Sequence, residues 1–506
     1  MARSSAHSQQ AQTSSRLPCI FLLAILLPFC WSSLAFCQEQ EKFPSLTQIR
    51  SGFQSSKEYL QERFQHAKNE PAFETADQIL INPSEVQWTR YLRSVLNLPS
   101  WIDLGVAFRI RGEVLTNPFR KGEFGTDDQL PLRTRLRMGF DVAPFRFLLE
   151  FQDSRSIGQD PGEFVSNALV NEHDIQQLFI STTFHDTFGT GLRSDVHVGR
   201  INMDFGGRRL IARNSFRNTT NAFDGGHLNV GVNSLWRIRA FVVRPVERTF
   251  GVIDEPFAES DTMFWGTYYE TQQLPWLNTN LYYFGLNDAD PNVSDQRQYS
   301  TFGGRFYQPA TNGGLDYEIE TAWQIGTRGG KDHFAHFQHG ELGHTFNAAW
   351  TPRIVAQYDY ASGTADPNGN FDQTFDTLFG ARRFEYNPTG LFGPFFRSNI
   401  NSPGIRTYLT PFPQGKLMLK YRAWWLAQGR DAWIGSGLQD PTGQAGTFLG
   451  QDIEFQITWS PSPFITFDAG YDHFFKGSYI QTLAEIPGNP PADDSDYVYL
   501  QAELQF

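Results

Sequence analysis

The sequence contains few cysteines, and their positions exclude a fold held together by disulfides. The only three are Cys19, Cys30 and Cys37, all within the first 37 residues. If that segment is removed at or near residue 37, the mature chain keeps at most one cysteine and forms no internal disulfide. A small, disulfide-stapled secreted domain is therefore excluded.

The first 37 residues have the organisation of a signal peptide. Arg3 and Arg16 make the start positive, and residues 17–31 are an apolar run followed by small residues. The run is too short for a membrane-spanning helix and ends close to a cleavage site. We predict that residues 1–37 are a signal peptide, with a lipid-bearing Cys37 as the alternative.

The rest of the chain lacks both long apolar runs and an excess of positive charge. No later stretch is apolar over the roughly 18 residues that a membrane helix needs. There are 42 Lys and Arg against 54 Asp and Glu, a formal net charge of −12. A helical membrane protein is excluded, and so is a basic surface for nucleic acid.

Aromatic residues are abundant although the chain is polar on average. They make up 15% of the sequence, with 46 Phe, while the mean hydropathy is −0.41. This combination suits a membrane barrel, which has an apolar band outside and a wet interior.

After Trp101 the hydrophobic pattern has a period of two, which indicates strands. In residues 102–111 apolar side chains alternate with Asp, Gly, Ala and Arg, and residues 132–141 repeat the alternation. Short turns and long loops then alternate along the chain, which favours an all-β, closed antiparallel transmembrane β-barrel of about 18 strands. We predict a partly helical periplasmic extension at residues 38–100 and the barrel at residues 101–506.

The predicted barrel has short periplasmic turns and long extracellular loops, so both termini are expected in the periplasm. The longest loop, residues 362–404, is rich in Phe, and we expect it to fold back into the channel mouth as a constriction. The last strand ends on Phe506, which resembles the assembly signal of outer-membrane barrels. The expected partners are outer-membrane lipids and the barrel assembly machinery of a diderm bacterium.

Several stretches resemble the alginate export family of outer-membrane barrels. They are VHVGR, RRLIAR and NAFDGGHL within residues 174–228, and YDYASG and FDTLFG within residues 358–380. One departure is Ile201 after Gly199-Arg200, where the family often has Gln, and another is the unmatched extension before Trp101. The resemblance implies a barrel that passes polymers or solutes, and it does not fix alginate as the substrate.

The strand parity places many charged side chains in the lumen. The inward cations expected are Arg109, Arg111, Arg133, Arg135, Arg137, Arg237, Arg239 and Arg305. The inward acids expected on an opposite wall are Asp316, Glu318, Glu320, Glu454, Asp468 and Asp472. Because arginine binds carboxylates through a bidentate fork, we interpret the cations as a track for an anionic solute. The alternative is that inward carboxylates such as Glu113, Asp141 and Glu150 neutralise them.

Motifs for chemistry are weak. His333, His336 and His339 lie in what we interpret as a loop, and in a helix their spacing would let them share a metal. A satisfied polar loop is the simpler interpretation, so we expect no metal and no other cofactor. The sequence has no nucleophile elbow, P-loop or dinucleotide fingerprint, and we predict that the protein is not an enzyme.

The sequence therefore predicts an outer-membrane channel for polar, anionic solutes, with an anionic polysaccharide or a small solute as the cargo. One alternative is a general nutrient-uptake porin. The alternative from another class is a secreted β-rich carbohydrate-binding protein, which would not contact a membrane.

Overall fold

The structure, a computed structural model, describes residues 92–158, 166–190, 192–232, 236–251, 253–254, 262–274, 276–288, 295–383 and 385–506. The predicted signal peptide and nearly all of the predicted extension lie outside these described residues. Residues 92–95 form one helical turn, and the first strand begins at Ile102.

Nearly all of the described chain is built from long strands. The first half contains β1 (Ile102–Thr116), β2 (Thr126–Val142), β3 (Phe145–Ile157), β4 (Asn171–Phe184), β5 (Arg193–Ile201), β6 (Phe223–Val232), β7 (Trp236–Pro245), β8 (Thr262–Leu274) and β9 (Leu277–Asp288). The second half contains β10 (Arg297–Gln308), β11 (Leu315–Arg328), β12 (Lys331–Thr345), β13 (Arg353–Ala361), β14 (Phe371–Asp372), β15 (Ile400–Leu409), β16 (Gly415–Trp425), β17 (Phe448–Ser462), β18 (Ile465–Lys476) and β19 (Ser495–Gln505). Two short helices, η1 (Thr187–Gly189) and α5 (Ser478–Leu483), lie in connections.

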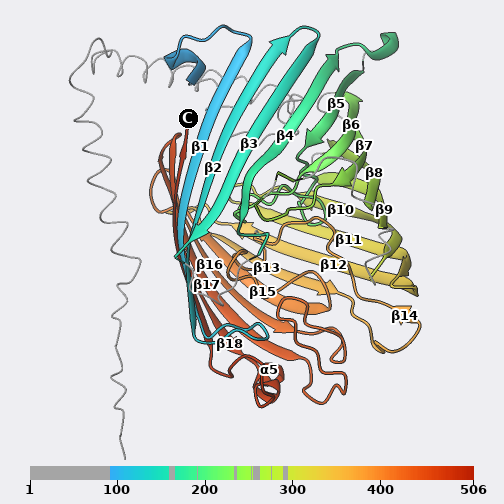
Figure 1. The fold of residues 1–506 in the computed structure, drawn as a ribbon, viewed down its shortest axis with the longest axis vertical. Helices are drawn as coiled ribbons and strands as arrows, with labels where there is room; N and C mark the ends of the chain where they lie inside the picture. Colours follow the sequence, from blue (N-terminus) through green and yellow to red (C-terminus); the bar gives the residue numbers. More distant parts are fainter. Residues whose placement is uncertain are drawn as a thin grey trace, which may run out of the picture. The chain divides into compact units, whose positions relative to one another are not determined.

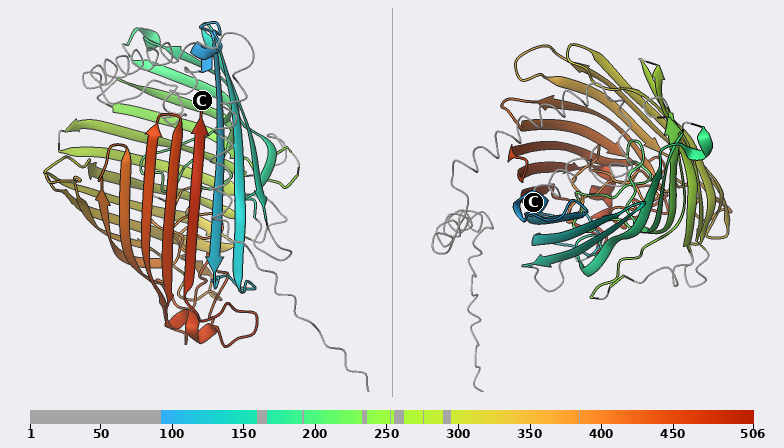
Figure 2. Two further views of the ribbon diagram at one scale, coloured as in Figure 1. Left: turned by 90° about the vertical axis from the view of Figure 1, so that its left-hand side faces the viewer. Right: turned by 90° about the horizontal axis from the view of Figure 1, so that it is seen from above.

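Eighteen of the strands in the described residues close a ring. Each pairs antiparallel with its neighbours in chain order, β13 pairs directly with β15, and β19 pairs with β1. The two-residue β14 lies outside this order and pairs parallel to β12. The prediction of a closed antiparallel barrel of about 18 strands is confirmed (Figures 1 and 2).

The two ends of the ring differ in the length of their connections. Among the described strands, eight connections leave one end and nine leave the other, as the sequence predicts. The second end carries the long loops, except for the tight turn Gly329–Gly330 between β11 and β12. The longest of these loops is shorter than predicted, because β15 begins at Ile400 rather than after residue 404.

The outer face of the ring is apolar. Strand β1, and strand β2 up to Phe140, alternate between buried inward positions and more exposed outward ones. Large apolar side chains stand exposed on the outer face around the ring: Phe108, Phe147, Leu178, Val198, Leu281, Ile319, Leu419 and Ile453. An apolar outer band fits the hydrocarbon of a bilayer. Within the described residues no helix has the length and apolar character needed to cross a membrane.

The seam between the first and last strands includes Phe506. Its N–H donates to the carbonyl oxygen of Val106 (2.8 Å) and its carbonyl accepts from the Val106 N–H (2.9 Å). The Phe506 ring stacks on Phe464 at 6.0 Å between centroids. Phe506 therefore adds two hydrogen bonds and a ring contact where the barrel closes.

Deleting Phe506 should reduce the amount of barrel assembled in the outer membrane, because the closing pair loses both contacts. The measurement is the fraction of outer-membrane protein that migrates faster on a gel unheated than after boiling. Phe506→Tyr is the matched control and should assemble normally. Equal assembly of the deletion variant and the wild type would contradict a role of Phe506 in closing the seam.

Candidate functional site

Five arginines form a patch on the inner face of two adjacent strands. Arg109 and Arg111 lie on β1, and Arg133, Arg135 and Arg137 lie on the paired β2, with Arg109 directly opposite Arg133. All five side chains are buried. We call these five residues the arginine wall.

The arginines are buried because two segments of the chain lie inside the ring (Figure 2). The first inward segment is residues 202–222, between β5 and β6, and the second is residues 362–399, between β13 and β15. The two pair with each other through their backbones. The N–H of Phe379 donates to Leu210 (2.9 Å), and the N–H of Ala212 donates to Phe379 (3.1 Å). They therefore form one composite obstruction.

Side chains of the arginine wall donate hydrogen bonds to the main chain of the first inward segment. Arg109 donates to the carbonyl oxygens of Ser215 (2.9 Å), Phe216 (3.1 Å) and Arg217 (3.0 Å). Arg133 donates to the same oxygens of Ser215 (2.8 Å) and Arg217 (3.2 Å). Carbonyl oxygens of the chain itself thus occupy donors that we expected a solute to use.

Carboxylates neutralise much of the remaining charge of the wall. The ion pairs are Arg111–Glu113 (2.6 Å), Arg133–Glu503 (3.3 Å), Arg135–Glu150 (3.8 Å) and Arg137–Glu150 (3.0 Å). Glu113 and Glu150 are among the neutralising residues expected from the sequence, whereas Asp141 pairs with Arg146 near a turn (2.9 Å). The wall is therefore partly compensated within the protein.

The other expected lumen residues are also mostly paired. Arg237 pairs with Glu270 (2.6 Å), and Arg305 pairs with Glu318 (2.6 Å). The further pairs made by the acids are Arg353–Asp316, Arg383–Glu454 (2.8 Å), Lys420–Glu454 (2.7 Å) and the Asn387–Asp472 hydrogen bond (2.6 Å). Asp468 accepts from Gln456 (2.8 Å).

The position expected for half of the acidic residues is wrong. Asp316, Glu318 and Glu320 lie on β11, across the ring from β2, as expected. The other three, Glu454, Asp468 and Asp472, lie on β17 and β18, which are near β1 because β19 closes the ring onto it. Parity gives the face of a strand but not its position around a closed ring.

An arginine that no sequence pattern singled out joins the two inward segments to each other and to strand β11. Arg209, in the first segment, bonds Glu318 and Glu320 of β11 and Glu385 of the second segment. Burial disfavours ionisation of Glu385, but the positive charges of Arg209, His339, Arg397 and Arg406 together outweigh it and hold the pKa of Glu385 well below its usual value. Glu385 is therefore ionised at neutral pH and links the segments.

The second inward segment also reaches the far side of the lumen. Arg383 donates to the hydroxyl of Tyr499 on β19 (3.1 Å), whereas Glu385 lies beside β12.

Only the irregular run of residues 202–222, with its four arginines, could have drawn attention to the first inward segment. Nothing in the local sequence indicates which carboxylates they meet.

The predicted histidine loop is wrong, because His333, His336 and His339 lie in strand β12. In a strand, His333 and His339 face the lumen, while His336 faces outward between two aromatic rings. Its ring centroid lies 5.0 Å from that of Trp323 and 5.3 Å from that of Tyr360. The three cannot share a metal, since alternate residues of a strand point to opposite faces.

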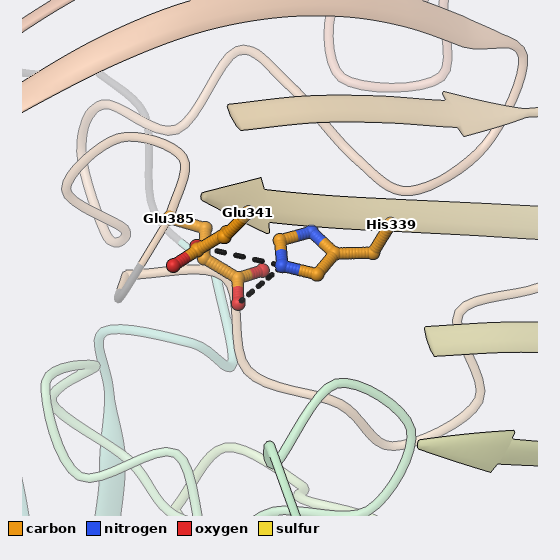
Figure 3. Close-up of side chains that lie close together, drawn as sticks. All are labelled: His339, Glu341 and Glu385. Carbon is orange, nitrogen blue, oxygen red and sulfur yellow. Dashed lines mark ion pairs between the residues drawn. The ribbon is translucent and has the colours of Figure 1, made fainter. Parts of the chain in front are cut away.

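One group of three potential metal ligands occurs among the described residues: His339, Glu341 and Glu385 (Figure 3). The Nε2 atom of His339 lies 3.4 Å from Glu341 and 4.0 Å from Glu385. Arg209, Arg397 and Arg406 already bond these two carboxylates. Three guanidinium groups leave little negative charge for a divalent cation, so we assign the group to anchoring the second inward segment.

Comparison with solved structures supports the fold. OccD3 (OpdP) of Pseudomonas aeruginosa is similar with a TM-score of 0.52 at 12% identity, over 80% of this chain and 91% of that one. OccAB3 of Acinetobacter baumannii has a TM-score of 0.54 at 12% identity, over 80% and 99%. OpdK of P. aeruginosa, solved with vanillate, has a TM-score of 0.52 at 10% identity, over 80% and 98%.

At the level of sequence, no curated protein matches significantly. The model of the alginate export family matches residues 100–485, which is most of the barrel. Family and fold together support an outer-membrane channel. The chain belongs to the alginate export family.

Proposed function

We propose that this outer-membrane channel passes polar, anionic solutes, and that the arginine wall is part of their path. The supporting observation is that Arg109 and Arg133 donate hydrogen bonds to main-chain carbonyl oxygens inside the lumen. These guanidinium donors are aimed at oxygen acceptors, and a carboxylate is a stronger acceptor than a carbonyl. A uronate or another carboxylate would displace the first inward segment and accept the same hydrogen bonds from Arg109 and Arg133.

The proposal also covers how the chain is exported and how the barrel is oriented in the outer membrane. Residues 1–37 direct export, residues 38–100 stay in the periplasm, and the short-turn end faces that compartment. Phe506 is read by the barrel assembly machinery. The protein carries out transport and catalyses no reaction.

Recording of single channels in planar bilayers tests the proposal. In a KCl gradient the wild-type channel should prefer anions, and oligogalacturonate should block the current more strongly than a neutral glucan of the same length. The cationic wall favours the uronate because the low-dielectric barrel strengthens its field in the lumen. A cation-selective channel, or equal block by both oligomers, would count against the proposal.

The second candidate function is uptake of small solutes, and the pairing of the two inward segments favours it. Because the segments cross the lumen and bond to each other, a polymer passes only if both move. The vanillate in the OpdK structure shows a small carboxylate with a barrel of similar fold. Block by monomeric galacturonate without block by the oligomer would favour this candidate.

A further inference from the structure

One arginine in the described part of the lumen has a whole guanidinium edge without a hydrogen-bond partner. Arg239 of β7 is 3% exposed and donates one hydrogen bond, from Nη1 to the carbonyl oxygen of Asp204 (3.0 Å). Its Nε and Nη2 atoms are buried and have no hydrogen-bond partner. These two atoms form the edge of a guanidinium group that binds a carboxylate in a bidentate manner.

Among the described residues, no carboxylate forms a direct ion pair with Arg239, and its neighbours explain why. Arg237, two residues earlier on the same face, lies opposite Glu270 and pairs with it (2.6 Å). Arg239 lies opposite Asn229 on one side and Tyr268 on the other, and both are uncharged. Asn229 donates its amide to Asp195 (3.0 Å), which leaves its side-chain oxygen without a partner.

A second polar side chain beside Arg239 is also unpartnered. His227 of β6 is 2% exposed, and neither ring nitrogen has a hydrogen-bond partner. It lies directly opposite His197 of β5, with ring centroids 5.6 Å apart. A neutral imidazole always carries one N–H, so His227 has a donor to offer in either tautomer.

Phe205 of the first inward segment covers this group from the lumen. The guanidinium carbon of Arg239 lies 3.7 Å from the centroid of the Phe205 ring, and the ring of His227 lies 6.1 Å from it. The Phe205 ring therefore covers the Arg239 and His227 side chains on the lumen side, and these two side chains supply hydrogen-bond donors from strands β7 and β6. Leaving a buried guanidinium edge unpaired is costly, so the arrangement favours a bound acceptor there.

We propose that Arg239 and His227 form a binding site for a small carboxylate, held against the barrel wall beneath Phe205. The two carboxylate oxygens accept from Nε and Nη2 of Arg239, and the imidazole N–H of His227 donates a third bond. The ligand class rests on the proposed function, because it is the carboxylate that the channel conducts. Since Phe205 belongs to the first inward segment, an occupied site holds that segment against β6 and β7.

Bromide, which gives an anomalous X-ray signal, tests whether an anion binds there. Crystals of the full-length mature protein soaked in sodium bromide should show an anomalous peak within hydrogen-bond distance of Arg239 Nε and Nη2. Adding sodium acetate should lower the peak, because acetate competes for the same edge. Arg239→Gln should abolish it and His227→Phe should weaken it.

The matched control removes the neighbouring ion pair without changing the net charge. The double variant Arg237→Gln/Glu270→Gln should keep the peak at Arg239. Wild-type crystals that show only water at this edge overturn the proposal, and so does a peak that survives in Arg239→Gln. A bromide peak that acetate does not displace would mark an adventitious halide site only and would overturn the carboxylate assignment. These outcomes do not depend on ion selectivity, so the proposed function can fail while the site stands.

Discussion

Replacing residues 362–399 by Asn-Gly should raise the single-channel conductance severalfold. The design is feasible because Ala361 and Ile400 are direct partners in the register of β13 and β15, and Asn-Gly closes a two-residue hairpin. The deletion removes a segment whose Phe375, Phe392 and Phe395 are buried inside the ring. An emptied barrel of this strand number leaves an aqueous channel, since side chains alone do not fill it.

The barrel itself should survive the deletion, because the hydrogen bonds of its strands lie in the ring. Faster migration of the unheated variant on a gel is the control for folding. Glu385→Gln is the milder variant: it weakens the bond to Arg209 but leaves Arg209 with Glu318 and Glu320. It should increase fluctuations of the current more than its mean. If a folded deletion variant conducts as the wild type does, the second inward segment is not a constriction.

The double variant Arg109→Gln/Arg133→Gln should shift the reversal potential in a salt gradient toward cations. It should also weaken the block by oligogalacturonate by about tenfold or more, because a charge-assisted hydrogen bond contributes about 1.5–3 kcal/mol. We prefer this pair to Arg135 and Arg137, because those two both pair with the buried Glu150 and their removal would leave Arg213 as its remaining cation.

Two further variants separate the track from the net charge of the lumen. Arg353→Gln removes an inward positive charge that is paired with Asp316. Because no contact joins Arg353 to the described residues of the first inward segment, this variant should leave the oligogalacturonate block unchanged. Arg109→Lys keeps the charge but not the planar fork, and should recover the selectivity more fully than the block. If the double variant keeps both wild-type properties, the arginines serve only to hold the first inward segment.

The sequence alone determined the barrel because its signals are local. A period of two from Trp101 onward fixes which side chains of each strand face inward, and the alternation of turns and loops fixes the number of strands. Arg109, Arg111, Arg133, Arg135 and Arg137 could be placed together for this reason, since β1 and β2 are consecutive and pair directly. The histidines were misplaced because three polar residues in a short run outweighed the alternation of β12.

Only the tertiary structure decided what fills the lumen. Closure of β19 onto β1 carried Glu454 and Asp468 to the side of the arginine wall, a consequence of ring position that no strand encodes. The first inward segment has no periodic pattern, and its carbonyl oxygens reach Arg109 across about a hundred residues of sequence. Arg209 meets Glu385 over a still longer separation. Such contacts depend on where a closed ring places its loops, which local periodicity does not specify.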